Sequence, residues 1–243
     1  MSLLQIKGLS KSFGGLMALS NLDFEVDEKE IVGLIGPNGS GKTTLFNTIM
    51  GSFKCDRGSI FFRNEDITGL KPHQVCQKGI ARTFQLTKPF HRMSCLENIM
   101  VGRSFGKDPA YGIKEAKREA GDILKLVRLE EKQQLPASAL NLIERKRLEL
   151  ARALAARPQL LLLDEIMAGL NPMEIKMAVG LIRQINHSGV TMVIVEHVMK
   201  ALLGISERVV VLDAGKKIAE GPPKEVVQNQ DVIKAYFGKN LHA

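Results

Sequence analysis

The sequence predicts an α/β fold in which a parallel sheet is accompanied by an antiparallel β portion and an inserted helical segment. Residues 3–9 and 22–26 alternate loosely between apolar and polar, as in a half-buried antiparallel sheet. The stretch 94–149 has helical spacing and no strong strand run. Short, largely apolar runs, typical of strands buried on both faces, recur at 31–35, 160–163 and 190–195.

The remaining elements follow from local signals between these segments. Asn141 can cap a helix, Glu144 three residues later completes a capping box, and Pro158 ends that helix. We also expect a turn at 10–15, a hairpin formed by 58–62 and 65–67, a short helix at 72–79, a strand at 80–85, a helix at 116–129, a hairpin at 208–219 and a last helix at 226–237.

The stretch that follows the strand at 31–35 fits the pattern G-x-x-x-x-G-K-[ST] of a phosphate-binding loop. A helical segment that ends before Gly51 comes next, so the motif has the strand–turn–helix context it requires. Converging backbone N–H groups and the helix dipole attract anions at such a turn. The residues expected to contact the nucleotide are Gly36, Pro37, Asn38, Gly39, Ser40, Gly41, Lys42, Thr43 and Thr44.

Two side chains of this loop have specific expected roles. Lys42 should reach the β- and γ-phosphates of ATP as an exposed cation, and the Thr43 hydroxyl should bind Mg²⁺. ATP and Mg²⁺ are therefore the predicted ligands. The alternative is a chance glycine-rich turn, against which the flanking strand and helix argue.

Two carboxylates, Asp164 and Glu165, end the four-leucine strand at 160–163. In an α/β sheet, ligands bind outside the carboxyl ends of the parallel strands. We expect Asp164 to hold Mg²⁺, directly or through water, and Glu165 to polarise the water that attacks the γ-phosphate. The alternative is a pair of solvated surface acids.

Three further residues are candidates for the same site. Gln85 ends the strand at 80–85, and His197 follows the strand at 190–195, although a lone histidine is more often structural. Phe13 lies on the turn expected at 10–15, where an aromatic ring can stack on adenine. A core position for Phe13 fits the spacing equally well.

Composition narrows the class of protein. The net charge of +8 is compatible with nucleic acid or an anionic membrane surface, but Lys and Arg are mixed with Glu, as at 114–119. We therefore interpret the charge as solvated helix faces and expect no nucleic-acid partner. No apolar run approaches the roughly 20 residues of a membrane helix, and residues 1–7 lack the pattern of a signal peptide. We expect a soluble intracellular chain with three reduced thiols, at Cys55, Cys76 and Cys95.

Taken in order, these motifs resemble the ATP-binding subunits of ABC transporters over essentially the whole chain. The resemblance implies a P-loop NTPase (RecA-like) core with an antiparallel β subdomain and an inserted helical subdomain. It implies that Phe13 stacks on adenine and that Gln85 is the Q-loop residue, with shares in catalysis and in Mg²⁺ binding. It also implies that His197 is a catalytic switch residue near the γ-phosphate. Glu165 is a further catalytic residue.

Within that family, residues 147–154 and 168–172 and the short C-terminal tail are similar to branched-chain amino acid importers. This likeness implies an ATPase that drives uptake of an amino acid, foremost Leu, Ile or Val, through separate transmembrane permease subunits. Alternatives are urea import, export of lipid or lipopolysaccharide, and a non-transport ABC ATPase that acts on ribosomes or DNA.

The resemblance also implies an assembly and a division of the chain. Two ATPase subunits, identical or different, would hold two ATP molecules between them at the cytoplasmic face of the cell membrane. A periplasmic or extracellular solute-binding protein would be an indirect partner. The implied division is a nucleotide-binding core of residues 1–85 and 157–225, a helical subdomain of residues 86–156 and a tail of residues 226–243.

One segment departs from the family pattern. The family signature Leu-Ser-Gly-Gly-Gln aligns with Leu140-Asn141-Leu142-Ile143-Glu144. Asn141, in place of the serine, is expected to contact the nucleotide held by a partner chain. Leu142 and Ile143 add bulk where glycine allows close backbone approach, and Glu144 adds negative charge, so we expect a weaker clamp.

Overall fold

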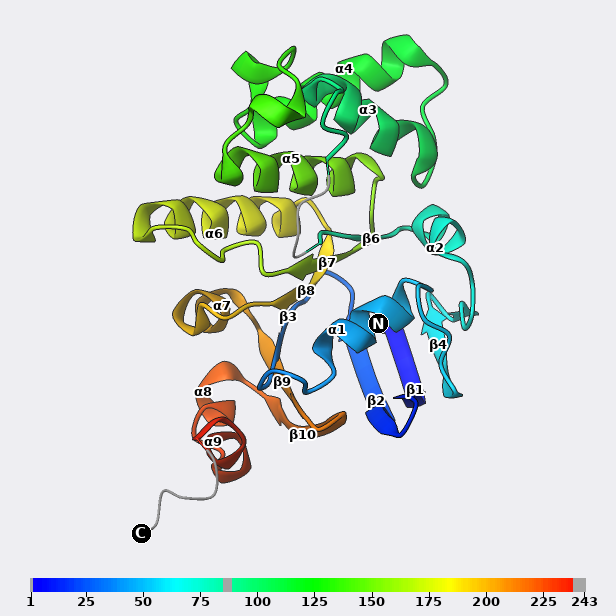
Figure 1. Ribbon diagram of the computed structural model, residues 1–243, viewed down its shortest axis with the longest axis vertical. Coiled ribbons are helices and arrows are strands. Elements are labelled where there is room, and N and C mark those ends of the chain that lie inside the picture. Colours follow the sequence, from blue (N-terminus) through cyan, green and yellow to red (C-terminus); the bar gives the residue numbers. More distant parts are fainter. Residues whose placement is uncertain (1, 85–88, 238–243) are drawn as a thin grey trace. The chain divides into compact units, whose positions relative to one another are not determined.

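The computed structural model describes residues 2–84 and 89–237 (Figure 1). The chain forms two compact units, one made of Met1–Pro72 with Thr191–Ala243 and the other of His73–Val190. No helix among the described residues is long and apolar enough to cross a membrane.

The first unit contains an antiparallel sheet with the strand order β2-β1-β4-β5. Its strands are β1 (Ser2–Phe13), β2 (Leu16–Asp27), β4 (Arg57–Phe62) and β5 (Glu65–Asp66). The turn predicted at 10–15 is wrong in extent, because β1 continues to Phe13, which pairs with Leu16 of β2. The connection shrinks to Gly14 and Gly15, and Gly14 has a φ of 58°, which suits a tight hairpin.

A second set of strands in the same unit surrounds β3 (Ile31–Ile35). β3 pairs in parallel with β8 (Thr191–Val195) and β9 (Arg208–Asp213), and β10 (Lys216–Gly221) pairs antiparallel with β9. Every residue of β3 and β8 is buried, as expected for apolar strands covered on both faces. The buried parallel strands and the final hairpin predicted from the sequence are therefore confirmed.

The helices in the described part of the first unit are α1 (Lys42–Ile49), α7 (Met199–Ile205), α8 (Pro223–Val226) and α9 (Gln230–Phe237). The single helix expected at 226–237 is instead the short α8 followed by α9. Asn229 separates them, since its side-chain oxygen accepts the N–H groups of Asp231 at 2.8 Å and Val232 at 3.4 Å.

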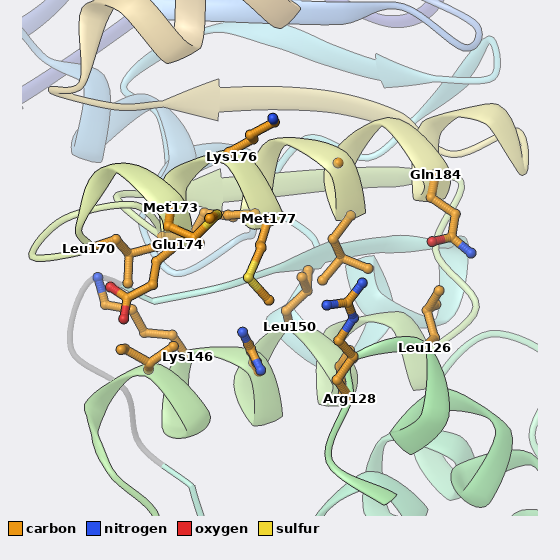
Figure 2. A pocket seen from close by; sticks show the side chains of 17 residues that line it. Leu126, Arg128, Lys146, Leu150, Leu170, Met173, Glu174, Lys176, Met177 and Gln184 are labelled. Carbon is orange, nitrogen blue, oxygen red and sulfur yellow. The ribbon is translucent and has the colours of Figure 1, made fainter.

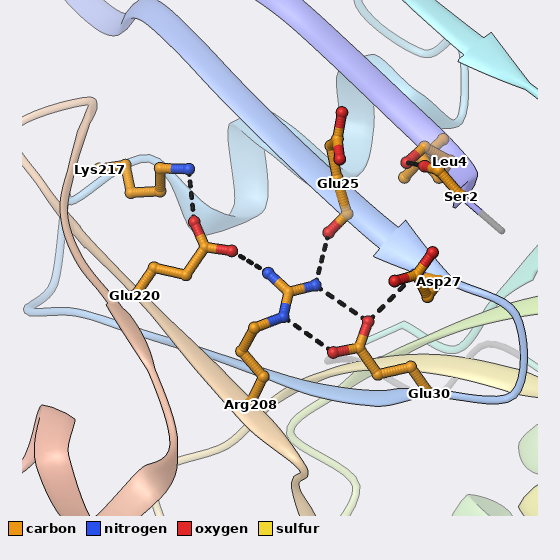
Figure 3. A network of polar contacts seen from close by, with 8 residues as sticks. All are labelled: Ser2, Leu4, Glu25, Asp27, Glu30, Arg208, Lys217 and Glu220. Carbon is orange, nitrogen blue, oxygen red and sulfur yellow. Dashed lines mark hydrogen bonds and ion pairs between the residues drawn. The ribbon is translucent and has the colours of Figure 1, made fainter.

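An ion-pair network fixes the start of β3 (Figure 3). The Arg208 guanidinium at the start of β9 donates to both carboxylate oxygens of Glu30, at 2.8 and 2.9 Å, and to the Glu25 carbonyl at 2.9 Å. It also bonds Glu220 of β10, whose other oxygen accepts from Lys217 at 2.5 Å. Because Glu30 directly precedes β3, the network holds the strand that leads to the phosphate-binding motif.

The second unit pairs β6 (Ile80–Arg82) in parallel with β7 (Leu160–Asp164). Its helices are α2 (Pro72–Lys78), α3 (Cys95–Phe105), α4 (Ile113–Leu126), α5 (Leu142–Ala155) and α6 (Pro172–His187), with short 3₁₀ turns at Glu130–Lys132 and Ala137–Ala139. β6 is shorter than the strand expected at 80–85, and α4 begins and ends three residues earlier than the helix expected at 116–129.

The helices α3, α4 and α5 share one apolar core. Apolar side chains at helical spacing on each of them are buried together, among them Leu96, Ile99, Ala120, Leu124, Leu148 and Ala151. The buried Arg103 of α3 bonds Glu119 of α4, which also accepts from Arg157 at 2.9 Å. This core holds α5, which leads into β7 and its terminal carboxylates.

Candidate nucleotide-binding site

The phosphate-binding motif forms the turn between β3 and α1 in the first unit. Gly36 has a φ of 150°, and a Cβ there would lie 2.1 Å from the Leu212 carbonyl oxygen, so only glycine fits. Gly41, with a φ of 106°, stands at the N-cap of α1 and has no side chain to cap it. The first-turn N–H groups of α1 are therefore placed to bind an anion.

Lys42, the first residue of α1, is buried rather than exposed as expected, with 8% of its surface accessible. Its ammonium donates to the carbonyls of Gly36 at 2.7 Å and Pro37 at 3.0 Å and to the Ser40 hydroxyl at 3.3 Å. The glycine-rich turn folds back over the lysine, and this closure brings the cation under the loop carbonyls. Thr43 is exposed on the first turn of α1, and Thr44 follows it.

The C-terminal helix α9 reaches this turn. The Gly36 N–H donates to the Tyr236 hydroxyl oxygen at 2.8 Å, and burial raises the pKa of Tyr236. A hydrogen bond therefore links the first glycine of the motif to a residue 200 positions later. Sequence reasoning missed this contact, because the pattern of the last helix indicates only one apolar face.

Phe13 and His197 also belong to the first unit. Phe13 is 43% exposed at the end of β1 and meets the ring of Phe53 edge-on at 5.1 Å, so the structure excludes a core position. His197 is exposed two residues after β8, which pairs with β3 up to Leu34 and Val195. His197 thus follows the carboxyl end of a strand adjacent to the one that leads into the glycine-rich turn.

The second unit contains the two strand-end carboxylates. Asp164 ends β7 and is buried, and its carboxylate accepts a hydrogen bond from the Arg82 guanidinium at 2.6 Å. The Asp164 N–H donates to the Thr83 hydroxyl at 3.1 Å. β6 and β7 therefore place a cation and an anion against each other, a pair that sequence reasoning did not identify.

Glu165 follows β7 in a left-handed backbone conformation, with a φ of 52°. Such a conformation is uncommon for a residue other than glycine and costs about 1–2 kcal/mol, so surrounding contacts must hold it. The Lys146 ammonium on α5 supplies two, since it donates to the carbonyls of Glu165 at 3.1 Å and Ala168 at 2.5 Å. Lys146 thereby spans the turn that begins at Glu165.

The signature segment is confirmed as a helix N-terminus. Asn141 caps α5, with its side-chain oxygen 2.9 Å from the Glu144 N–H, and the Glu144 carboxylate accepts the Asn141 N–H at 3.1 Å. The other oxygen of Glu144 accepts from Lys132 at 2.5 Å. The carboxylate therefore turns back toward its own helix, and one first-turn N–H of α5 is already satisfied.

Gln85 lies outside the described residues, but the chain just before it has a notable contact. Glu149 of α5 is 5% exposed, and its carboxyl oxygen accepts the Phe84 N–H at 2.7 Å. Burial raises the pKa of Glu149 to about 7, although Arg152, Lys146 and Arg82 oppose the shift. The sequence carries no signal for this contact, because Glu149 lies within an amphipathic helix pattern in which a glutamate is expected to face solvent.

A glycine-rich turn between a buried strand and a helix, together with carboxylates after another buried strand, defines a P-loop nucleotide-binding protein. The family model of ABC transporters matches residues 19–168, and a model named for branched-chain amino acid ATP-binding cassette transporters matches residues 216–242. The chain belongs to the ABC transporter family, and within it is an ATP-binding ATPase.

Relatives and solved structures agree with this assignment. The chain is 40% identical to a high-affinity branched-chain amino acid transport ATP-binding protein, LivG, of Salmonella typhimurium, with 98% of each chain covered. It is 38% identical to BraF of Pseudomonas aeruginosa, also over 98% of each. A nucleotide-free ATP-binding cassette superimposes with a TM-score of 0.90 at 31% identity, covering 98% of this chain and all of the other. The predicted fold class is therefore confirmed.

Proposed function

We propose that this ATPase powers the uptake of branched-chain amino acids through separate transmembrane permease subunits. The observation that carries the proposal is the match of residues 216–242 to the family model of branched-chain amino acid cassettes. Those residues include β10 and α9, and α9 supplies Tyr236 to the phosphate-binding turn. The feature specific to this branch of the family thus contacts the nucleotide-binding motif itself.

The family resemblance gives each candidate residue a proposed role. Lys42 and the motif from Gly36 to Thr44 bind the phosphates, and the exposed ring of Phe13 stacks on adenine. Glu165 orients the attacking water, with Gln85 and His197 as the other catalytic residues. Asn141 contacts the nucleotide of the partner ATPase subunit.

The proposed ligand set includes Mg²⁺, held by Thr43, Gln85 and Asp164. The buried Asp164 carboxylate is already paired with a cation of the protein, Arg82, and carboxylate oxygens are the ligands that Mg²⁺ prefers. No group of three or more His, Cys, Asp or Glu side chains gathers in the described part of the chain. The phosphates of ATP would complete the ligand set, and bound Mg²⁺ would neutralise charge that develops on them.

The proposal sets the protein in an assembly. Two ATPase subunits, identical or different, pair at the cytoplasmic face of the membrane as peripheral subunits, and a solute-binding protein outside delivers the amino acid. A related cassette of 26% identity has been solved as a dimer with ADP and phosphate, and another, cbiO1 of Clostridium perfringens, belongs to an ABC transporter complex. The division into a core of residues 1–85 and 157–225, a helical part of residues 86–156 and a tail stays a prediction.

The decisive experiment replaces Glu165 with Gln in the assembled transporter. The substitution preserves shape and removes the carboxylate, so we expect ATP binding to persist while ATP turnover and leucine uptake fall by about 10²–10⁴-fold. Turnover like that of the wild type would overturn the role of Glu165. Unchanged leucine uptake in cells that lack the whole chain would overturn the cargo.

Lipopolysaccharide is the alternative cargo, and one specific observation favours it. The chain is 34% identical to a lipopolysaccharide export ATP-binding protein, LptB, of Haemophilus influenzae, over 99% of both chains. The two cargoes separate in a deletion strain, because loss of an importer abolishes labelled leucine uptake and loss of the exporter leaves it intact.

A further inference from the structure

The second unit contains a cavity of about 400 Å³ between α5 and α6, here termed the α5–α6 cavity. Its volume falls in the range of about 300–1,000 Å³ typical of small-molecule sites. Figure 2 shows Leu150 of α5 and Met173 and Met177 of α6 in the space between the two helices. The apolar part of the wall includes Leu126, Val127, Leu150, Leu170, Met177 and Leu181.

The charged part of the wall is mainly cationic. Arg128 borders the cavity just after α4, and Lys146 and Arg147 border it from α5. Lys176 lines it as well, but Figure 2 shows its ammonium pointing away from α5. Among the described lining residues the one carboxylate is Glu174, which accepts the Asn171 N–H at 2.8 Å in the capping box of α6. The wall therefore complements a molecule with an apolar body and a negative head.

Two methionines make the apolar wall adaptable to an unbranched, flexible chain. Met173 and Met177 carry unbranched thioether side chains, which adapt to a ligand by rotating about several bonds. We propose that the α5–α6 cavity binds a medium-chain fatty carboxylate. Its chain lies on Met173, Met177 and Leu150, and its carboxylate bonds Arg128 and Arg147.

Lys146 connects this cavity to the turn at Glu165. It lines the cavity, and its ammonium also holds the carbonyls of Glu165 and Ala168. A ligand in the cavity contacts the Lys146 side chain and displaces its ammonium from these carbonyls of the strained turn, so ligand binding slows hydrolysis. The binding step stands by itself, and only the effect on turnover rests on the proposed role of Glu165.

Two glycines provide a matched test. Gly180 of α6 lines the cavity, Gly121 of α4 does not, and a Cβ at either position meets no atom within 4 Å. Gly180→Leu is designed to narrow the cavity, and Gly121→Leu makes the same change elsewhere in the unit. Both replace a helical glycine with a better helix former, so neither should impair folding.

Decanoate, kept below its micelle concentration, is titrated calorimetrically into the purified full-length chain. We expect binding to the wild type and to Gly121→Leu, with at least about tenfold weaker binding to Gly180→Leu. Arg128→Gln should weaken binding about tenfold, as expected for the loss of one charge-assisted hydrogen bond. Decylamine, with the opposite charge, should not bind.

Several results would overturn the proposal. Equal binding of decanoate to the wild type and Gly180→Leu would place the ligand elsewhere, and equal binding of decylamine would remove the role of the cations. If decanoate does not bind and Gly180→Leu blocks assembly with membrane subunits, the cavity is a docking site for a segment of those subunits and not for a fatty carboxylate.

The effect on turnover is measured in the assembled transporter. Decanoate should slow ATP turnover by about fivefold or more in the wild type and in Gly121→Leu, but not in Gly180→Leu. Equal slowing in all three would overturn the coupling through Lys146. A failure of the proposed cargo leaves the calorimetric result unchanged, so the two proposals fail separately.

Discussion

Arg82 and Asp164 form an ion pair of 2.6 Å in which the two side chains are 5% and 4% exposed. The pair joins the last residue of β6 to the last residue of β7. Two buried charges stabilise a fold only as a pair, because either one alone keeps its desolvation penalty. The carboxylate proposed to bind Mg²⁺ is therefore held in place by a cation of the protein itself.

Arg82→Met should lower the free energy of unfolding by about 3–5 kcal/mol, because Asp164 would remain buried without its partner. Denaturant unfolding measures this loss. Arg118→Met is the control, since Arg118 is exposed and lies 3.5 Å from Glu119. That variant should lose less than about 1 kcal/mol. Equal small losses in both variants would contradict the importance of the buried pair.

Lys42→Ala should remove the nucleotide-induced rise in melting temperature, because that rise reports binding to the folded state. Since Lys42 is buried and bonds the carbonyls of Gly36 and Pro37, the nucleotide-free variant should also melt below the wild type. Thermal unfolding with and without Mg-ATP tests both effects. A full ATP-induced shift in the variant would refute the phosphate-binding role.

Tyr236→Phe should weaken ATP binding by up to about fivefold, since it removes one hydrogen-bond acceptor, worth about 1 kcal/mol, from the Gly36 N–H. The chain has one other tyrosine, the fully exposed Tyr111, so Tyr111→Phe is a matched control. Calorimetric titration with ATP compares the two variants. Identical affinities would mean that α9 does not support the phosphate-binding turn.

Glu149→Gln should change how stability depends on pH. Burial raises the pKa of Glu149 to about 7 in the folded chain. In the unfolded chain, where the carboxyl is exposed to water, its pKa is the ordinary 4.5. The folded chain therefore favours the protonated form, and this contribution to stability is present below about pH 4.5 and lost as the pH rises through 7. Glutamine keeps an acceptor for the Phe84 N–H and does not titrate.

Between pH 4.5 and pH 8 the wild type should thus lose about 3 kcal/mol of unfolding free energy relative to Glu149→Gln. Denaturant unfolding of both chains at the two pH values gives this difference. Parallel pH profiles for the two chains would show that Glu149 ionises in the fold without cost.

The altered signature predicts two unequal ATP sites when the partner is a different ATPase with glycines in its signature. Asn141 already accepts the Glu144 N–H, so the N-terminus of α5 offers less to a phosphate. The site on this chain's own Lys42 should then be the stronger one. Disabling Lys42 should reduce ATPase activity and uptake more than disabling the partner's equivalent lysine. Equal losses, or full transport by a homodimer, would remove the asymmetry.

The features that sequence predicted are those encoded by neighbouring residues. The glycine-rich turn before Lys42 and the capping box of Asn141 and Glu144 each depend on a few consecutive positions, and the structure contains both. The extent of β1 was missed because its pairing with β2, and not the polar residues near Phe13, decides where the strand ends.

The contacts that sequence did not predict join distant positions. Arg82 and Asp164 are 82 residues apart, and Gly36 and Tyr236 are 200 apart. No local periodicity encodes such a pair, since each partner satisfies the pattern of its own strand or helix. The burial of Lys42 was missed for a related reason, because it depends on how the turn closes in three dimensions.

The backbone of Glu165 imposes a conflict on selection experiments. Its φ of 52° is a conformation that glycine and asparagine adopt at less cost than glutamate. A library randomised at this position and screened only for thermal stability should be enriched in Gly and Asn, neither of which has a carboxylate. A screen for ATP turnover should return glutamate, so at this one residue selection for thermal stability and selection for activity favour different amino acids.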